Sequence, residues 1–316
     1  MNNMEVMNYD EFKEYVIEHL MEYISDEHKS FELVVDSVYK PNCTLDCIAL
    51  RDTSNRVMVS PTIYINAMYM DYSEHSDSMV DVLKGYADMM EQAFNFPIAK
   101  IDFSSAKDNL VMELVNTDAN KEMLAGIPHR RFEDLSIIYK WVLSNDENGI
   151  QSALVTNGLA DLIGLSEEDI YKLAYENTRK VYPVDVFDFS DVAEEIYLGQ
   201  GMPSEMLDEL GDYLDNFAMP GDVMWVMSNK PRIGGSVSMV YEDELYALSC
   251  KLNDDLWVLP SSRHEVFCVR AGSFDSADVL REMVCEVNDT GVSLEDKLSD
   301  SVYYYSRADR KLSVVE

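Results

Sequence analysis

Apolar residues in the first hundred positions alternate between helical and extended spacing. In residues 8–27 they recur every three or four positions, which predicts an amphipathic helix capped by Asn8 or Asp10. A similar pattern at 76–94 predicts another helix, which Pro97 would end. Between these helices, runs rich in Val, Ile and Tyr predict three strands, at 31–39, 45–51 and 57–65. This order of elements is typical of an α+β fold.

The middle of the chain shows extended runs followed by a helix. Residues 110–115 and 132–143 predict strands, and the polar turn at 144–149 predicts that the second strand continues into a hairpin. A helix is expected after Ser166, because Asp169 follows three residues later as in a capping box. The first turns of this helix are acidic, so it is poorly suited to reading a DNA groove.

The last third of the chain returns to strands and one helix. Strands are predicted at 223–227, 255–260 and 264–269, a helix at 276–288, and a final strand in SVYYYSRADRKLSVV. Residues 183–221 are rich in carboxylates, Gly and Pro, and include a short amphipathic helix predicted at 204–217. The expected fold class is α+β, with mixed or antiparallel sheets and packed helices in two interlocked halves. The expected parts are an N-terminal half at 1–182, an acidic connecting segment at 183–221 and a C-terminal half at 222–316.

Charge changes the picture more than overall composition does. The 316 residues include 59 acidic and 25 basic side chains, which gives a net charge of −34. Such a surface repels phosphate, so direct nucleic-acid binding is not expected. We interpret the charge first as a means of staying soluble. Two alternatives stay open: a docking surface for a basic protein partner, and mimicry of nucleic acid that inhibits a DNA-binding protein.

The cysteines and the hydropathy profile bear on location and cofactors. The five cysteines are odd in number and scattered, which is typical of free thiols in a reducing cytoplasm. We expect no membrane association, because no run of about 18 apolar residues and no secretory signal are present. Cys43 and Cys47 have no second ligand pair nearby, so neither a metal nor another cofactor is expected. The oligomeric state stays open.

Residues 259–265, LPSSRHE, hold the candidate site residues Ser261, Ser262, His264 and Glu265. One hypothesis is a hydrolase-like enzyme in which a serine is the nucleophile and His264 the base, and a second is a metal site at His264 and Glu265. The third is a structural turn that joins two core strands. We favour the turn, because a serine and a histidine two or three positions apart rarely face each other.

Three blocks of the chain together resemble an uncharacterised bacterial, Firmicutes-type family of unknown function with a Leu-Pro-Ser-Ser-x-His-Glu motif. The blocks are VTN at 155–157 with GLSEED at 164–169, LPSSRHE at 259–265, and LREMVCEVN at 280–288 with LSDSVY at 298–303. The resemblance spans about residues 8–310 and implies a cytosolic bacterial α+β protein. It implies no reaction, cofactor or catalytic residue. We therefore predict a non-enzymatic binding or interaction protein.

Overall fold

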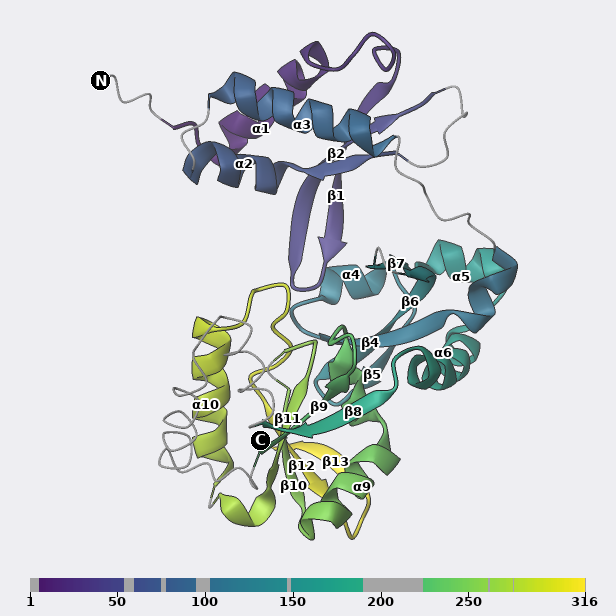
Figure 1. Ribbon diagram of the computed structural model, residues 1–316, viewed down its shortest axis with the longest axis vertical. Helices are drawn as coiled ribbons and strands as arrows, with labels where there is room; N and C mark the ends of the chain where they lie inside the picture. Colours follow the sequence, from purple (N-terminus) through teal and green to yellow (C-terminus); the bar gives the residue numbers. More distant parts are fainter. Residues whose placement is uncertain are drawn as a thin grey trace. The chain divides into compact units, whose positions relative to one another are not determined.

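The chain forms two compact units, Met1–Ile98 and Ala99–Glu316. The computed structural model describes residues 6–53, 60–74, 78–94, 103–146, 149–189, 224–260, 262–274 and 276–315. Within each unit, helices pack on antiparallel sheets (Figure 1), so the expected α+β fold class is confirmed. None of the described helices is both long and apolar enough to cross a membrane.

The first unit is a three-stranded sheet with helices packed on it. The strands, in the order β1-β2-β3, are β1 Glu32–Lys40, β2 Cys43–Arg51 and β3 Thr62–Tyr64. The helices are α1 Tyr9–His19, α2 Ile65–Glu74, α3 Met79–Ala93 and the short 3₁₀ helix η1 Leu20–Glu22. Of the two expected caps, Asn8 is the one that caps α1, in a capping box with Glu11. Phe12, Leu50 and Leu83 are fully buried in one core.

The strand expected at 57–65 is described from residue 60 onwards, and a helix that the pattern did not reveal follows it. Thr62–Tyr64 pairs with β2, and α2 begins at Ile65. Ile65 and Met68 are three positions apart and both fully buried, which is helical spacing. The run of apolar residues was therefore shared between two elements.

The second unit is built on two antiparallel sheets. One has the order β4-β6-β5, with β7 also paired to β6: β4 Leu110–Asn116, β5 His129–Phe132, β6 Leu135–Asp146 and β7 Gly149–Leu154. The other has the order β13-β12-β10-β11-β9-β8. Its strands are β8 Val184–Asp188, β9 Met224–Asn229, β10 Leu256–Leu259, β11 Val266–Arg270, β12 Val302–Ser306 and β13 Lys311–Val315.

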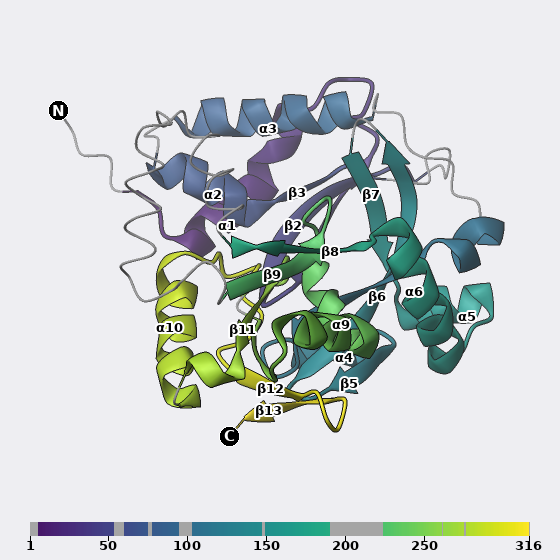
Figure 2. The ribbon, with the colours of Figure 1, turned by 60° about the horizontal axis from the view of Figure 1, so that its bottom comes forward.

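Helices pack on both sheets of the second unit. They are α4 Lys121–Ala125, α5 Asn157–Ile163, α6 Glu167–Val181, α9 Glu242–Leu252 and α10 Ala277–Thr290. Short 3₁₀ helices are η2 Phe103–Asp108, η3 Gly235–Val240 and η4 Ala271–Ser273. Ser166 and Asp169 form the predicted capping box of α6. Helix α10 lies beside strands β11 and β12 (Figure 2), where Leu280 and Val284 are buried in one cluster with Val269.

One core joins the two sheets of this unit, so the division of the chain differs from the expected one. Leu110 and Tyr139 of the first sheet lie in the same buried cluster as Val258 and Tyr303 of the second. Strand β8 also pairs with β9 along its whole length. The segments before 183 and after 221 therefore belong to one unit, and the boundary falls between Ile98 and Ala99. The helix predicted at 204–217 lies outside the described residues.

Candidate functional site

The link between β10 and β11 is held by backbone hydrogen bonds to two other segments. Arg263 donates its backbone N–H to the carbonyl of Asp296, at 2.8 Å, and accepts at its own carbonyl from Ser236, at 3.2 Å. Ser262 forms an isolated antiparallel bridge with Lys297. The link is therefore fixed between η3 on one side and the loop after α10 on the other. Strand β10 is central in its sheet and ends at Leu259, before Pro260, which cannot donate to the strand ladder.

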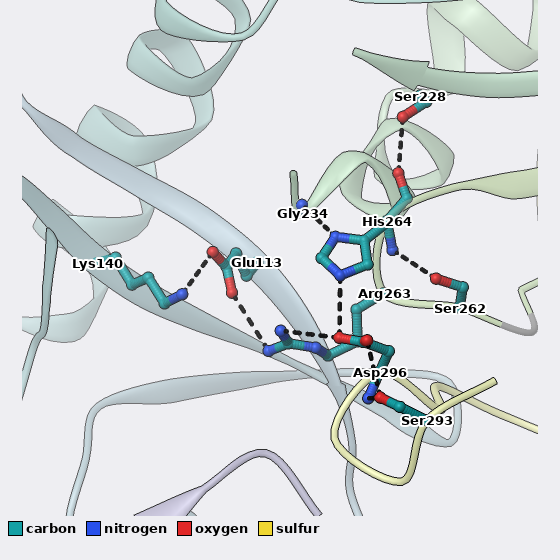
Figure 3. Close-up of polar contacts among 9 residues, drawn as sticks. All are labelled: Glu113, Lys140, Ser228, Gly234, Ser262, Arg263, His264, Ser293 and Asp296. Carbon is teal, nitrogen blue, oxygen red and sulfur yellow. Dashed lines mark hydrogen bonds and ion pairs between the residues drawn. The ribbon is translucent and has the colours of Figure 1, made fainter. Parts of the chain in front are cut away.

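Both ring nitrogens of His264 have hydrogen-bond partners (Figure 3). Nε2 lies 2.9 Å from Asp296 Oδ1, and the backbone N–H of Gly234 donates to Nδ1 at 3.3 Å. Because an amide N–H only donates, Nδ1 is the accepting nitrogen and Nε2 holds the proton that it donates to the carboxylate. Both ring nitrogens of His264 therefore have a hydrogen-bond partner within the protein.

Three side chains contact the carboxylate of Asp296: those of His264, Ser293 and Arg263. Ser293 Oγ donates to Oδ2 at 2.8 Å, while Arg263 Nη2 lies 3.6 Å from Oδ1. Burial raises the pKa of Asp296, but hydrogen bonds from Ser293 and His264 and the charge of Arg263 lower it by more. The net pKa of this carboxyl lies below its usual value. Asp296 is thus a stable anion that orients His264 and Arg263.

A second carboxylate, Glu113 on β4, connects Arg263 to the sheet of β4, β5 and β6 (Figure 3). Lys140 Nζ on β6 lies 2.7 Å from Glu113 Oε1, and Arg263 Nη1 lies 3.6 Å from Oε2. The side chains of Glu113 and Arg263 are only 9% and 13% exposed. We call Lys140, Glu113, Arg263, Asp296 and His264 the charge network. The charges of its first four members alternate in sign, so loss of one of these would leave a neighbouring charge uncompensated in a poorly hydrated place.

Two adjacent glycines allow η3 to approach the backbone of His264. Gly234 has a φ of +61°, a left-handed conformation that glycine adopts without strain. A Cβ at Gly235 would lie 2.4 Å from the His264 carbonyl oxygen and 2.3 Å from Ser228 Oγ. The Ser228 hydroxyl donates to that same carbonyl at 2.6 Å. Glycine at 235 is therefore a steric requirement of the site.

Among the candidate residues that the structure describes, Ser262 and His264 do not form a nucleophile–base pair. Ser261 lies outside the described residues. Ser262 Oγ accepts a hydrogen bond from the backbone N–H of His264 at 3.0 Å, so it serves the local turn and not the imidazole. The ring of His264 contacts Asp296 and Gly234 instead. Within the described part of the chain, no three His, Cys, Asp or Glu side chains are grouped to hold a metal ion.

Glu265 lies in different surroundings from its neighbour. It lines a cavity of about 200 Å³, together with Phe187, Ser228 and Phe267 among others. Burial raises the pKa of Glu265, and the hydrogen bond from Ser262 and the charges nearby offset only part of that rise. The carboxyl is thus held in an environment that disfavours its ionised form. Among the three candidates that the structure describes, Glu265 is the one that lines this cavity.

Most of the charge network could not be found from the sequence. Asp296 lies 32 positions from His264, in a loop with no distinctive spacing. Glu113 and Lys140 sit within runs of strand residues, where a single charged side chain is usually exposed. The Gly234–Gly235 pair is the one local signal, because adjacent glycines before an apolar run indicate a close backbone approach.

The chain matches the model of a family described as Family of unknown function (DUF5688) over residues 9–307. The match covers most of the sequence, so the chain belongs to that family. The expected membership of an uncharacterised family is confirmed. No curated protein matches the chain, and no solved structure does.

Proposed function

We propose that this member of the family is a non-enzymatic binding protein whose acidic surface docks a basic protein partner. The proposal rests on His264, the most chemically capable side chain of the motif. A general base needs an accepting nitrogen within reach of the substrate's proton. Here the backbone N–H of Gly234 donates a hydrogen bond to the accepting nitrogen, and Asp296 accepts a hydrogen bond from the other nitrogen. The imidazole therefore has a structural task.

Charge supports a cationic partner. The net charge is −34, and several arginines form ion pairs with carboxylates of the same chain. Three of them make two hydrogen bonds each to a carboxylate of the second unit: Arg130 to Glu167, Arg179 to Asp243 and Arg310 to Glu242. The charge of each of these three arginines is thus balanced by a neighbouring carboxylate. The excess of carboxylates is thus left to attract a surface of opposite sign.

The proposed setting is the cytoplasm of a bacterium. All five cysteines are free thiols in the structure, as a reducing compartment requires. The bacterial origin is inferred from the resemblance of the sequence blocks. The cytoplasmic location and the bacterial origin are both part of the proposal, because they decide which basic proteins the chain could meet.

The test is capture of partners from host lysate, followed by calorimetry of the purified pair. We expect the captured protein to be basic and the Kd to rise at least about tenfold between ~0.05 and ~0.5 M salt. An unrelated acidic protein of similar charge density serves as the control and should not capture the same partner. A neutral partner, or an affinity that ignores salt, would contradict the proposal.

A hydrolase-like enzyme is the second candidate, and one observation favours it. The 2.9 Å contact of His264 Nε2 with Asp296 resembles the orienting half of a catalytic triad. The test compares the hydrolysis of an activated ester such as p-nitrophenyl acetate by the wild type and by His264→Gln. We expect no turnover above the buffer rate in either. Turnover that the substitution abolishes while the melting temperature is unchanged would establish the enzyme.

A further inference from the structure

Strand β1 is an edge of the sheet in the first unit. It runs for nine residues in unbroken antiparallel register with β2, from the pair Glu32–Arg51 to the pair Lys40–Cys43. Among the described residues, the sheet has the order β1-β2-β3, so β1 is paired with β2 on one side and with no strand on the other (Figure 1). A long edge strand of this kind is a template for pairing with another chain.

Every second residue of β1 directs its backbone N–H and C=O away from β2. In an antiparallel pair, residues that exchange hydrogen bonds alternate with residues that do not. The N–H of Leu50, which lies opposite Leu33, donates to the carbonyl of Pro61 at 3.3 Å, on the β3 side of β2. Leu33 thus belongs to a pair that does not exchange hydrogen bonds. The same holds for every second residue after it: Val35, Ser37 and Tyr39.

The side chain of Asp36 binds one of these outward N–H groups. The backbone N–H of Ser37 donates to Asp36 Oδ1 at 2.8 Å, away from the β2 ladder. Both residues are exposed, so this hydrogen bond competes with water and contributes little to stability. An incoming strand could replace it with a backbone carbonyl and leave the carboxylate of Asp36 for a different partner.

Two other sheet edges are held by side chains from neighbouring elements. On β4, the N–H of Met112 donates to Thr178 Oγ1 of α6 at 2.8 Å. On β13, the N–H of Val314 donates to the carboxylate of Glu133 at 3.3 Å. These edge groups are therefore bound by residues distant in sequence, whereas the N–H of Ser37 on β1 is bound by the residue next to it.

The side chains of β1 supply apolar contact on one face and charge on the other. Val35 and Tyr39 are 39% and 45% exposed, and they share the face of the sheet that Ile48 buries against the helices. Asp36 points to the opposite face, where the residue across from it on β2 is Cys47 and not a basic residue. A strand that complements this edge has apolar residues on one face and a lysine or arginine on the other.

We propose that β1 accepts an extended basic segment of the partner protein as an added antiparallel strand. Its backbone would exchange hydrogen bonds with Val35 and Ser37, its apolar side chains would cover Val35 and Tyr39, and its lysine or arginine would lie opposite Asp36. The inference rests on the proposed docking of a basic protein and deepens it, because it names the place and the manner of that docking.

Charge disfavours a second copy of this chain as the added strand. Two copies with a net charge of −34 each repel one another. Symmetric antiparallel pairing about the middle of β1 would also set Asp36 opposite the same residue of the other copy, and like charges directly opposite are destabilising. A segment with a cation at this position avoids both penalties.

The first experiment measures the binding of a fluorescently labelled peptide, Thr-Val-Thr-Thr-Lys-Val-Thr-Leu-Lys, to the full chain by anisotropy. In antiparallel register its central lysine lies opposite Asp36, and its valines lie opposite Tyr39 and Val35. We expect saturable binding that weakens as salt is added, because a charged pair contributes to it. No binding at millimolar concentration would overturn the proposal.

Two N-methylated forms of the peptide test the manner of binding. Methylation of the two amides opposite Val35 and Ser37 removes N–H donors that face β1, so the Kd should rise at least about tenfold. Methylation of the two amides opposite Val34 and Asp36, which face away from β1, is the matched control and should change the Kd little. Equal losses from the two patterns would show that the peptide does not add as a strand.

The second experiment assigns the charge contact to Asp36. Asp36→Lys should weaken the peptide at least about threefold and tighten a form whose central lysine is replaced by glutamate, because the cross-strand pair is reversed. Glu18→Lys makes the same change of charge on α1, where the side chain is 74% exposed, and should alter neither affinity in ~0.15 M salt. Melting curves check that each variant folds. Equal effects of the two substitutions would overturn the assignment.

A third measurement separates this inference from the proposed function. Val35→Pro removes an N–H that faces the free edge, where an edge strand tolerates proline, and it changes no charge. The basic partner captured from lysate should bind this variant at least about tenfold more weakly than the wild type. Undiminished binding would show that β1 is not the docking site, while the docking of a basic protein would stand.

Two further outcomes are also decisive. If no basic partner is captured, the proposed function fails, and the peptide series decides by itself whether β1 accepts a strand. If the wild type is a dimer that Val35→Pro dissociates, as measured by analytical ultracentrifugation, the occupant of the edge is a second copy and the proposal is overturned.

Discussion

His264 and Glu265 are neighbours in the chain, yet their surroundings are opposite. Every polar atom of His264 is engaged: the ring by Asp296 and Gly234, the N–H by Ser262 and the carbonyl by Ser228. Glu265 instead lines a cavity and has a raised pKa. A motif that looks like one reactive cluster in the sequence thus separates into a structural residue, His264, and a carboxyl group, Glu265, that lines a cavity. The following variants test that separation.

The largest effect is expected from Gly235→Ala, which disrupts the close packing of η3 against the backbone of His264. The added Cβ would lie 2.3 Å from Ser228 Oγ and 2.4 Å from the carbonyl oxygen of His264, so η3 must move away. We expect the free energy of unfolding to fall by about 3 kcal/mol or more, as measured by urea denaturation. Gly158→Ala, where the Cβ meets nothing closer than 3.9 Å, is the control and should change little. A tolerated Gly235→Ala would contradict the close packing.

Glu113→Gln should have the next largest effect. It leaves Lys140 and Arg263 without their shared carboxylate in a place where Glu113 is 9% exposed. We expect a loss of about 2 kcal/mol in the free energy of unfolding. In the double variant with Lys140→Met, the loss should be smaller than the sum of the two single losses, because the two groups interact. Strict additivity would show that they do not.

Asp296→Asn should cost stability at neutral pH and less in acid. The pKa of Asp296 is lowered in the folded state, so its contribution is present above the unfolded pKa of about 3.9 and is lost as pH falls through the folded pKa. The gap between wild type and variant, measured by urea denaturation at a series of pH values, should therefore close towards acid. A gap independent of pH would argue against an ionised Asp296.

Glu265→Gln should have the smallest effect and the opposite sign. The folded-state pKa of Glu265 is raised, so the wild type gains stability as pH falls through that value, down to the unfolded pKa of about 4.3. At neutral pH the variant should be as stable as the wild type or more stable, by less than about 1 kcal/mol. That difference should shrink in acid. A variant that is less stable at neutral pH would show that Glu265, like His264, stabilises the fold.

Local features of the fold could be predicted, because they depend on nearby residues. The caps Asn8 and Ser166, the two-sided apolar strand β10 and its end at Pro260 all follow from spacing and side-chain type. The boundary between the units could not, because it depends on one core that Leu110 shares with residues of distant strands. The acidic run at 183–221 indicated a boundary through its composition alone.

The candidate site divides in the same way. The sequence identified the segment and favoured a structural turn. It could not show that the partners of this turn are Asp296, Gly234 and Glu113, since these meet it only through tertiary packing. Nor could it show that Glu265 lines a cavity, because that cavity is formed by side chains from three strands.

The position of β12 has a consequence for synthesis on the ribosome. Tyr303 and Tyr305 of this strand are fully buried among residues that emerge much earlier, such as Leu110 and Tyr139. The second unit therefore cannot complete its core until β12 has left the exit tunnel, and its early strands must wait with apolar faces uncovered. The core of the first unit is complete by α3 and can form during translation. Nascent chains stalled before β12 should thus be a target for chaperones.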